Sequence, residues 1–333
     1  QLRERSRYEV ANNSYARGIV LTIANDTIGT GPRLQLLSDD TDLNRQVERD
    51  FTAWSNAVGL PEKLRTMRMA RCQDGESFAL LMANPKINHA IQMDVQLIEA
   101  DQVAGELTFT HKDNDIDGVK LDEHGNPVSY RVLKKHPGGQ SFSVSDDANI
   151  IPANAMIHCF RSDRPQLHCG IPEITPALPR FAQLRRFTLA VITAAESAAN
   201  FAGILYTDAP ASGEADAVEP MDLIELERNM LLTMPGGWKM SQLQPEQPAT
   251  TYAEFKHEIL NEIARCLNMP YNIAAGNSSG YNYSSGRLDH QTYFKAIRVD
   301  QDFIARTVLD RILHIWLTEY LLASNKPVSR ILP

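Results

Sequence analysis

Cysteine is scarce in this chain of 333 residues, and the four cysteines are spread widely along it: Cys72, Cys159, Cys169 and Cys266. So few and so widely spaced cysteines do not suit the disulfide framework of a small secreted domain, and we expect free thiols in a reducing compartment. The first residues also lack the charged and apolar pattern of a secretory signal. Because the chain opens on Gln1 and stops at Pro333, we expect both residues to lie within a longer protein.

Long hydrophobic runs are also lacking. The most apolar stretch, Phe187–Leu205, has about the length of a membrane span. It is rich in alanine, however, and it contains residues that are costly within a bilayer: Thr188, Glu196, Ser197 and Asn200. We therefore expect no membrane role.

Positive charge is in short supply. The 33 lysines and arginines are outnumbered by 41 aspartates and glutamates, which gives a formal net charge of −8. A chain of this sign repels nucleic acid on average, so the sequence does not suggest a sequence-specific reader of DNA. The hydrophobic share of 43% and the charged share of 22% are ordinary for a globular protein with one large domain or two smaller ones.

Metal-binding motifs with an established spacing are missing. His158-Cys159 and His168-Cys169 form two adjacent pairs, which together offer four zinc ligands. Neighbouring residues on a strand point to opposite faces, so the strand expected around His158 argues against a shared zinc site. We expect these four residues to be ordinary strand and loop residues.

Two other stretches each lack an essential part of the motif that they resemble. Asp113–Gly118 is similar to the opening of a calcium-binding loop, but the twelfth position is His124, and we expect a solvated turn.

Gly276–Gly280 lacks the Lys and Ser/Thr of a phosphate loop. The same five residues match a nucleophile elbow around Ser278, but neither the strand before that elbow nor the helix directly after it is expected here. We therefore expect no catalytic residue, metal or cofactor, and only an enzyme site assembled in the folded chain stays open as an alternative.

The N-terminal part is expected to be helical. Apolar residues recur every three or four positions over Tyr8–Ile28, and Gly29 ends that pattern. Further helices are predicted over Leu43–Val58 and from Pro61 to Cys72, followed by a strand over Ser77–Met82.

The region from Val95 to Phe160 has the pattern of β-structure. Short strands are predicted at Gly118–Leu121, Val128–Leu133 and Pro152–Phe160. The turn residues His124–Pro127 lie between the first two of these strands and predict a β-hairpin.

Three long helices are predicted in the second half of the chain. Ala177–Phe201 carries many small residues, which suit either close packing against copies of the same helix or burial in a core. Tyr252–Leu267 is amphipathic and ends before Pro270. Ala274–Ser285, rich in Gly, Asn and Ser, is expected to be flexible, and the last helix is predicted over Gly286–Leu322.

A strongly acidic module occupies Tyr206–Gln247. Within it, the pattern predicts a short helix at Met221–Met230 and a strand at Trp238–Leu243.

The most distinctive motifs lie between residues 252 and 287. They are Tyr-Ala-Glu-Phe from Tyr252, the run Ile259–Tyr271 and Asn-Tyr-Ser-Ser-Gly-Arg over Asn282–Arg287. This part of the chain resembles the signature region of the lambda-like portal proteins, the head-tail connectors of tailed bacteriophages. Shorter pieces follow the order expected for that family: Tyr15–Val20, Gly75–Phe78, Gly118–Asp122 with Asn126–Tyr130, Arg164–Gln166 with Gly170–Pro172, and Met234–Gly237.

The resemblance implies an α+β portal fold with a mixed α/β wing, a two-helix stem, a small α/β clip and a tunnel loop. Carried over by position, the parts are a wing over 1–172, a first stem helix over 173–205, a clip over 206–250, a second stem helix over 251–269, a tunnel loop over 270–285, and a long wing helix over 286–333 that leads towards a crown missing from this sequence.

The resemblance also implies a structural role without catalysis. Portal subunits form a ring of about twelve copies at one capsid vertex. The ring is the channel through which double-stranded DNA passes non-specifically during packaging and ejection, and it docks the terminase, the head-completion or adaptor proteins and the major capsid protein. The implied location is the virion, and the host cytoplasm during assembly. A phage-associated enzyme, such as a minor capsid protease or a nuclease, is the alternative function.

Two sets of residues are candidates for these contacts. The tunnel-loop residues expected to face DNA are Asn277, Ser278, Ser279, Tyr281, Asn282 and Tyr283. Their amides and hydroxyls would hold phosphates more weakly than lysine or arginine would. The clip residues expected to dock a basic partner are Glu214, Asp216, Glu219 and Asp222. An ordinary surface loop and a solvated acidic face are the respective alternatives.

Overall fold

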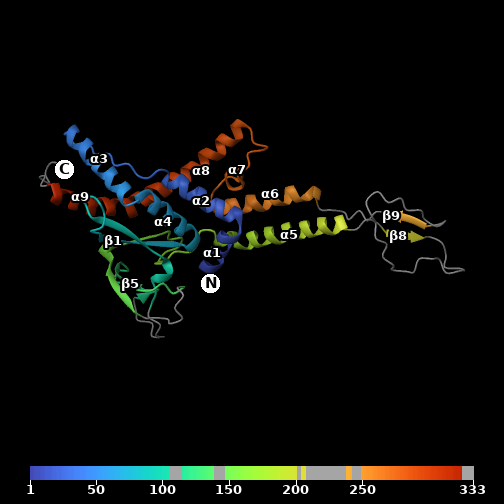
Figure 1. Ribbon diagram of the computed structural model, residues 1–333, viewed down its shortest axis with the longest axis horizontal. Coiled ribbons are helices and arrows are strands. Elements are labelled where there is room, and N and C mark those ends of the chain that lie inside the picture. Colours follow the sequence, from blue (N-terminus) through green and yellow to red (C-terminus); the bar gives the residue numbers. More distant parts are fainter. Residues whose placement is uncertain (106–114, 139–146, 201–203, 208–237, 242–248, 325–333) are drawn as a thin grey trace. The chain divides into compact units, whose positions relative to one another are not determined.

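The computed structural model describes residues 1–105, 115–138, 147–200, 204–207, 238–241 and 249–324 (Figure 1). The chain divides into two compact units. The main unit contains Gln1–Phe181 and Leu260–Pro333, and the helix-pair unit contains Ala182–Ile259.

Four helices open the main unit: α1 (Leu2–Asn12), α2 (Ser14–Ile28), α3 (Thr41–Ala57) and α4 (Leu60–Asp74). The prediction of one helix over Tyr8–Ile28 is wrong because Asn13 is extended and caps a new helix. Its side-chain oxygen accepts hydrogen bonds from the N–H groups of Tyr15 and Ala16. The chain therefore starts a second helix at Ser14.

Gly75 ends α4 and lets the chain turn into the first strand. Its φ of 94° lies in the left-handed region, and a Cβ atom there would lie 2.5 Å from the backbone carbon of Ile171. Only glycine fits both the conformation and the close approach. The turn places the end of α4 directly beside the segment that leads to the later helix α5 (Leu178–Asn200).

The first sheet lies between two hydrophobic clusters. Its strand order is β2 (Met93–Ile98), β1 (Glu76–Ala83), β7 (Met156–Phe160), and all pairings are antiparallel. Along β1, Ala79 and Leu81 join the cluster formed with the helices, whereas Phe78 joins the cluster under the second sheet. Burial on both faces explains why β1 reads as a continuous apolar run.

The second sheet has the order β3 (Asp115–Ile116), β4 (Val119–Leu121), β5 (Pro127–Leu133), β6 (Ala148–Pro152). The predicted hairpin is confirmed: β4 pairs with β5 in antiparallel fashion, and the Asp122 carboxylate accepts hydrogen bonds from the N–H groups of His124 and Asn126. The short 3-10 helices η1 (Ala100–Gln102), η2 (Ala153–Ala155) and η3 (Thr175–Ala177) connect these elements.

The last helical segment begins earlier than predicted and is not uniform. It consists of α8 (Tyr283–Ile304), a π-helical turn η4 (Ala305–Leu309) and α9 (Asp310–Ser324). From Ile304 onwards its buried residues recur every four positions: Ile304, Val308, Ile312, Trp316 and Tyr320. A stripe with a period of four drifts around an ordinary α-helix of 3.6 residues per turn, and the wider π turn compensates for part of that drift.

Two tryptophans form the centre of the main core. Trp54 on α3 and Trp316 on α9 are both fully buried, with ring centroids 6.2 Å apart, and Phe51 lies edge-on against Trp316. The Trp54 indole N–H donates a hydrogen bond to the Met93 carbonyl oxygen at 2.9 Å. Helices from both ends of the chain are thereby fixed to the first sheet.

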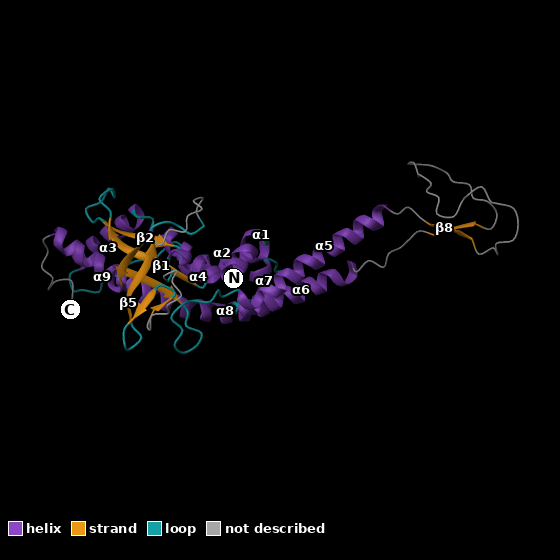
Figure 2. Cartoon of the chain, turned by 90° about the horizontal axis from the view of Figure 1, so that it is seen from below, coloured by secondary structure: helices purple, strands orange, loops and turns teal. Residues whose placement is uncertain are grey.

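The helix-pair unit contains most of α5 (Leu178–Asn200) and α6 (Ala249–Cys266), which lie side by side in both views (Figures 1 and 2). The Phe187 ring packs on the rings of Tyr252 and Phe255, with centroids 5.8 and 4.1 Å away. Strand β8 (Ile204–Thr207) pairs with β9 (Trp238–Ser241), which confirms a strand starting at Trp238. The predicted helix at Met221–Met230 falls outside the residues that the structure describes.

The mixed content of helices and antiparallel sheets confirms the predicted α+β class. Within the described residues, none of the helices has both the length and the apolar character needed to span a bilayer.

Candidate functional site

The predicted DNA-facing loop is shorter and more ordered than the sequence suggested. A short helix, α7 (Tyr271–Ala275), precedes it, and α8 already begins at Tyr283, so the irregular segment is 276–282. Gly276 ends α7 with a φ of 63°. The expectation of a flexible stretch over Ala274–Ser285 is thus wrong at both of its ends. Tyr283, predicted as a loop residue, is the first residue of a helix.

Hydrogen bonds fold the loop onto itself. The Asn277 N–H donates to the Asn272 carbonyl oxygen at 3.1 Å, and the Tyr281 N–H donates to the Ser278 carbonyl oxygen at 3.2 Å. The Ser279 N–H donates to the Asn277 side-chain oxygen at 2.9 Å. These bonds make the loop a defined turn rather than an extended connection.

The six predicted residues differ in what they offer to a ligand. Asn282 caps α8: its side-chain oxygen accepts from the Ser285 N–H at 2.8 Å. Tyr281 is half-buried, and its burial together with the Asp289 carboxylate raises the pKa of its hydroxyl, which stays neutral. Ser278, Ser279 and Tyr283, like Asn277, are exposed. No charged residue occurs between Tyr271 and Gly286, so the loop presents hydroxyls and amides, and the exposed Tyr283 ring lies directly after it.

Asn272 anchors the loop, a role that the sequence analysis did not assign to it. Its side chain is 7% exposed and donates a hydrogen bond to His290 Nε2 on α8 at 3.1 Å. Its carbonyl oxygen accepts the Asn277 N–H described above. The loop therefore starts from a residue that is bonded both to α8 and to the loop itself.

Helix α8 is tied to the N-terminal helix α2. The Tyr293 hydroxyl donates to the Asp26 carboxylate at 2.8 Å, and the Gln301 amide donates to the Thr27 carbonyl oxygen at 3.1 Å. Burial and the hydrogen bond to Asp26 both raise the pKa of Tyr293. These contacts hold the helix that carries the loop.

A buried ion-pair group joins α8 to α4 and to the turn before α5. It consists of Arg68, Arg71, Glu173 and Asp300. Arg68 Nε lies 2.6 Å from Asp300, and both arginines lie 3.0 Å from Glu173. Burial opposes ionisation of Glu173, but the guanidinium groups of Arg68 and Arg71, with a smaller contribution from Arg161 at 3.7 Å, hold its pKa below the usual range. Sequence alone gives no sign of this group, because its members are separated by up to 232 positions.

His158 and Cys159 point to opposite faces of strand β7, as the strand pattern predicted. His158 Nε2 lies 3.0 Å from the Glu76 carboxylate, and its ring stacks on Phe78. Cys159 points to the other face of β7 and is buried in the main core. In the calcium-like stretch, Gly118 N–H donates to the Asp115 carboxylate in a turn, as expected, whereas Asp113 falls outside the described residues.

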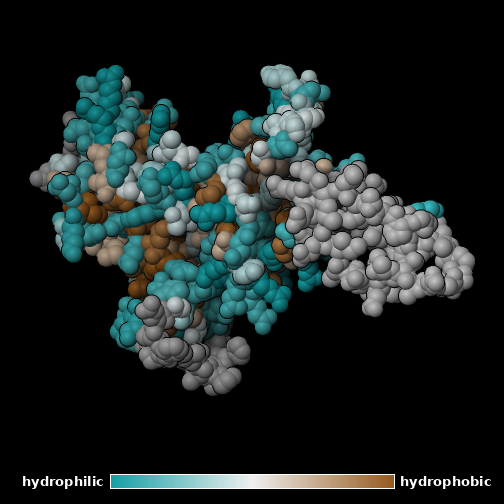
Figure 3. Space-filling view, turned by 45° about the vertical axis from the view of Figure 1, so that its right-hand side comes forward, coloured by the Kyte–Doolittle hydropathy of each residue, from teal (hydrophilic) through white to brown (hydrophobic). Residues whose placement is uncertain are grey.

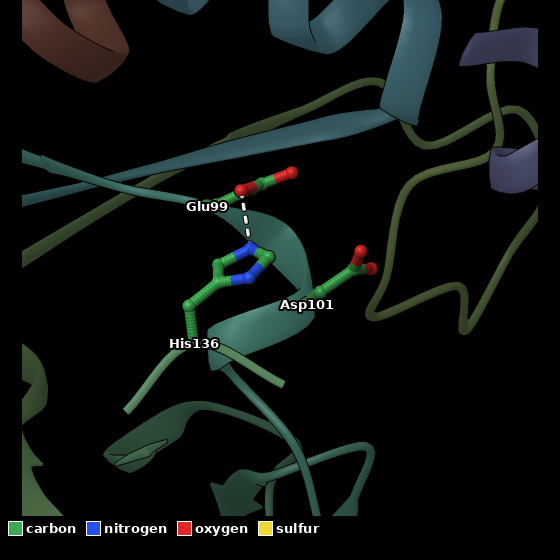
Figure 4. A group of neighbouring side chains, drawn as sticks. All are labelled: Glu99, Asp101 and His136. Carbon is green, nitrogen blue, oxygen red and sulfur yellow. Dashed lines mark ion pairs between the residues drawn. The ribbon is translucent and has the colours of Figure 1, made fainter. Parts of the chain in front are cut away.

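One group of side chains in the described part of the chain has the spacing of metal ligands: Glu99, Asp101 and His136 (Figure 4). The His136 ring faces the Glu99 carboxylate at 2.5 Å. Both carboxylates are already paired with arginines: Arg7 lies 2.8 Å from Glu99 and 2.5 Å from Asp101, and Arg3 lies 2.7 Å from Asp101. The two guanidinium groups already neutralise the carboxylates that a metal ion would need as ligands. We therefore assign no metal to this group.

Several exposed apolar side chains lie on long helices. Leu288 and Val299 on α8 are 65% and 71% exposed, and Leu189 and Ile192 on α5 are 58% and 48% exposed. Figure 3 shows a largely hydrophilic surface with separate hydrophobic patches. The predicted clip residues Glu214, Asp216, Glu219 and Asp222 are not among the residues that the structure describes.

Comparisons with known proteins confirm the family that the sequence motifs indicated. A sequence model of phage portal proteins, lambda family, matches residues 1–301. A probable portal protein of Halomonas phage phiHAP-1 is 24% identical over 343 residues, an alignment that covers 95% of this chain and 65% of that protein. The chain thus spans about two thirds of the length of this relative.

Two solved structures have a similar fold. A chain from the neck of an empty gene transfer agent particle, computed with C6 symmetry, has a TM-score of 0.52 and 17% identity over 95% of this chain and 80% of that one. A chain from the virion of a native gene transfer agent particle has a TM-score of 0.50 and 16% identity over 96% of this chain and 80% of that one. Because the family match extends over most of the sequence, the chain belongs to the lambda family of phage portal proteins.

Proposed function

We propose that this protein is a non-catalytic subunit of a ring at the capsid vertex, and that the ring is the channel through which the phage genome is packaged and ejected. The family match over residues 1–301 carries this proposal. The likeness to a chain in a particle neck with rotational symmetry supports it. A ring of about twelve copies is the expected assembly, in which one face of each subunit meets a different face of the next.

In this proposal the loop 276–282 faces the DNA. Its hydroxyl and amide groups can accept or donate hydrogen bonds to phosphates, and it carries no cation that would bind them strongly. As DNA moves through the channel, its hydrogen bonds with the loop must form and break continually. Weak, neutral and non-specific contacts therefore suit a channel.

The loop contact can be tested in filled particles that contain Ser278→Cys subunits modified with a photo-cross-linker. We expect cross-links to DNA, because Ser278 is exposed on the loop. Ser14→Cys, at an exposed position on α2, is the control and should give none. DNA cross-links from Ser14→Cys but not from Ser278→Cys would show that another surface faces the channel.

The outward face of α8 is our candidate for part of the ring interface. Leu288 and Val299 are eleven residues apart, or about three helical turns, and lie on the same side of the helix. A neighbouring subunit that covers two such exposed apolar side chains removes them from water, which stabilises the assembled ring.

This interface is tested by native mass spectrometry of the double variant Leu288→Glu/Val299→Glu. Wild-type protein should form closed rings, and the double variant should remain largely monomeric because the two carboxylates would be buried without partners. Leu37→Glu/Leu322→Glu makes the same change at two exposed leucines elsewhere and should leave the rings intact. If the α8 variant still forms rings, this face is not part of the interface. If the wild-type protein forms no rings, the result argues against the channel itself.

The acidic module over Tyr206–Gln247 is proposed to dock the terminase and later the head-completion or adaptor proteins, while the wing contacts the major capsid protein. Charge-reversing Glu214, Asp216 and Glu219 should weaken binding of the terminase, most clearly at low salt, where charges are least screened. Unchanged affinity at low salt would contradict this docking role.

The absence of catalysis is part of the proposal. We expect purified rings to leave DNA and capsid protein intact, with or without divalent metal ions. Cleavage that a chelator abolishes would instead favour a nuclease with a site assembled in space.

A further inference from the structure

A groove of about 1210 Å³ lies between the segment after α2 and one face of α3. Residues 30–34 form one wall of this groove. The other wall is a stripe along α3 that contains Arg45, Arg49, Thr52 and Asn56, at positions i, i+4, i+7 and i+11. This spacing brings all four side chains to one side of the helix.

The groove is positively charged in a chain that is negatively charged as a whole. Arg33, Arg45 and Arg49 line it. Among the described residues, neither Arg33 nor Arg49 makes a side-chain hydrogen bond or ion pair, and the Arg45 guanidinium lies 3.9 Å from the exposed Asp42 carboxylate. Two arginines four residues apart on a helix repel each other, and an anionic ligand would remove that repulsion.

The two acidic side chains of the groove offset only part of the charge of its three arginines. Glu48 lines the groove, but its carboxylate accepts a hydrogen bond from the Leu36 N–H at 2.9 Å, on the segment that follows the first wall. Asp42 is 95% exposed and approaches Arg45 alone. The guanidinium groups of Arg33 and Arg49 are left to meet a ligand from solvent.

Apolar groups lie between the charged ones. Pro32, Leu34, Ala53 and Pro61 are apolar members of the lining. The volume exceeds the range of roughly 300–1,000 Å³ that is typical of sites for small molecules. The stiff backbone of a DNA duplex carries phosphates at fixed spacing but no flexible apolar side chains, so it fits these apolar surfaces less well than a peptide does.

We propose that this groove binds an acidic segment of a partner protein, with carboxylates on the three arginines and apolar side chains against the prolines and Leu34. Arginine forms paired, charge-assisted hydrogen bonds with carboxylates, and groups of arginines are a common means of recognising acidic segments. The site does not depend on the channel function proposed above, because its ligand is protein and its residues are distant in sequence from the loop.

The proposal is tested by fluorescence anisotropy with assembled protein and two labelled peptides. One alternates two glutamates with one leucine, and the other has lysine in place of glutamate. The acidic peptide should bind, the basic peptide should not, and added salt should weaken binding. In the variant Arg45→Gln/Arg49→Gln, the affinity for the acidic peptide should fall by about tenfold or more.

The matched control is Arg5→Gln/Arg17→Gln, which removes the same charge from two exposed arginines on α1 and α2, outside the groove. It should bind like the wild type. Equal affinity of the groove variant and the wild type, or an equal loss in the control variant, would overturn the proposal. A DNA duplex that binds more tightly than the acidic peptide, and only when Arg45 and Arg49 are present, would overturn it in favour of nucleic acid. Circular dichroism should show both variants folded, since all four side chains are exposed.

Discussion

Removing one carboxylate from the buried ion-pair group should destabilise the main unit strongly. In Asp300→Asn the shape of the side chain is kept, but Arg68 and Arg71 lose one of their two shared carboxylates. The side chains of Arg68, Arg71 and Glu173 are 3, 4 and 2% exposed, and that of Asp300 is 13% exposed. Water therefore cannot replace the lost partner.

The expected loss is about 3 kcal/mol in the free energy of unfolding. Breaking a buried ion pair by removing one partner typically costs about 3–5 kcal/mol, because the remaining charge stays buried. The lower end applies because Glu173 still faces both arginines. Urea unfolding followed by tryptophan fluorescence measures this loss directly, since Trp54 and Trp316 lie in the core of the same unit.

Asp302→Asn is the matched control, two positions away on the same helix. Asp302 pairs with Arg306 at 2.7 Å, but these side chains are 66% and 69% exposed. An exposed pair four residues apart on a helix contributes about 0.5 kcal/mol or less. Equal losses in the free energy of unfolding for the two variants, measured at one protein concentration, would refute the claim that burial makes this ion-pair group important for stability.

Three further predictions follow from individual contacts. Asn272→Ala removes the bond to His290, and chymotrypsin should cleave within 276–282 several times faster than in the wild type. Gly170→Ala would place a Cβ atom 2.0 Å from the Gly75 oxygen, so the variant should lose at least about 2 kcal/mol in urea unfolding. Burial raises the pKa of the Cys72 thiol, and burial together with Glu76 raises that of Cys169 to about 12, so at pH 8 a thiol reagent should modify neither before unfolding.

Acid should also weaken the main unit through Glu173. Its pKa is lower in the folded protein than in the unfolded chain, where a glutamate titrates near about 4.3. The stabilisation is therefore complete above that value and is lost as the pH falls towards the lower, folded pKa. The free energy of unfolding, measured from pH 7 down to pH 3, should fall more steeply in the wild type than in Glu173→Gln. Parallel curves would show that Glu173 is not held ionised by the two arginines.

The sequence predicted the elements that can be recognised from a few neighbouring residues. The strand predicted at Ser77–Met82 is β1 (Glu76–Ala83), and the hairpin turn at His124–Pro127 lies between β4 and β5. Alternation and turn residues are read within a few positions, so neither prediction needed knowledge of the rest of the fold. The break at Asn13 was missed because the apolar period continues across it.

The anchoring contacts could not be predicted in the same way. Arg68 and Asp300 are far apart in the sequence, and charged residues at such positions usually face solvent. Asn272 looked like one more polar residue of the expected tunnel loop over 270–285. Only the fold shows that it is buried beside His290. The same holds for Arg33, which lines one groove with the α3 arginines only in the folded chain.

The way in which α8 is held bears on the proposed DNA contact. Tyr293 and Gln301 bind α8 to α2, Asp300 binds it to α4, and Asn272 binds the loop to its first turns. In the proposed channel, a loop joined to a helix that is held in this way would move little with a passing duplex, so each contact with a phosphate would form and break at one place. Neutral hydroxyls and amides release phosphates easily, whereas a lysine at the same fixed place would retain them. If the loop lines the channel, its lack of charge is therefore a consequence of its rigidity. Ser278→Lys should then slow DNA ejection from filled particles, and an unchanged rate of ejection would contradict this account.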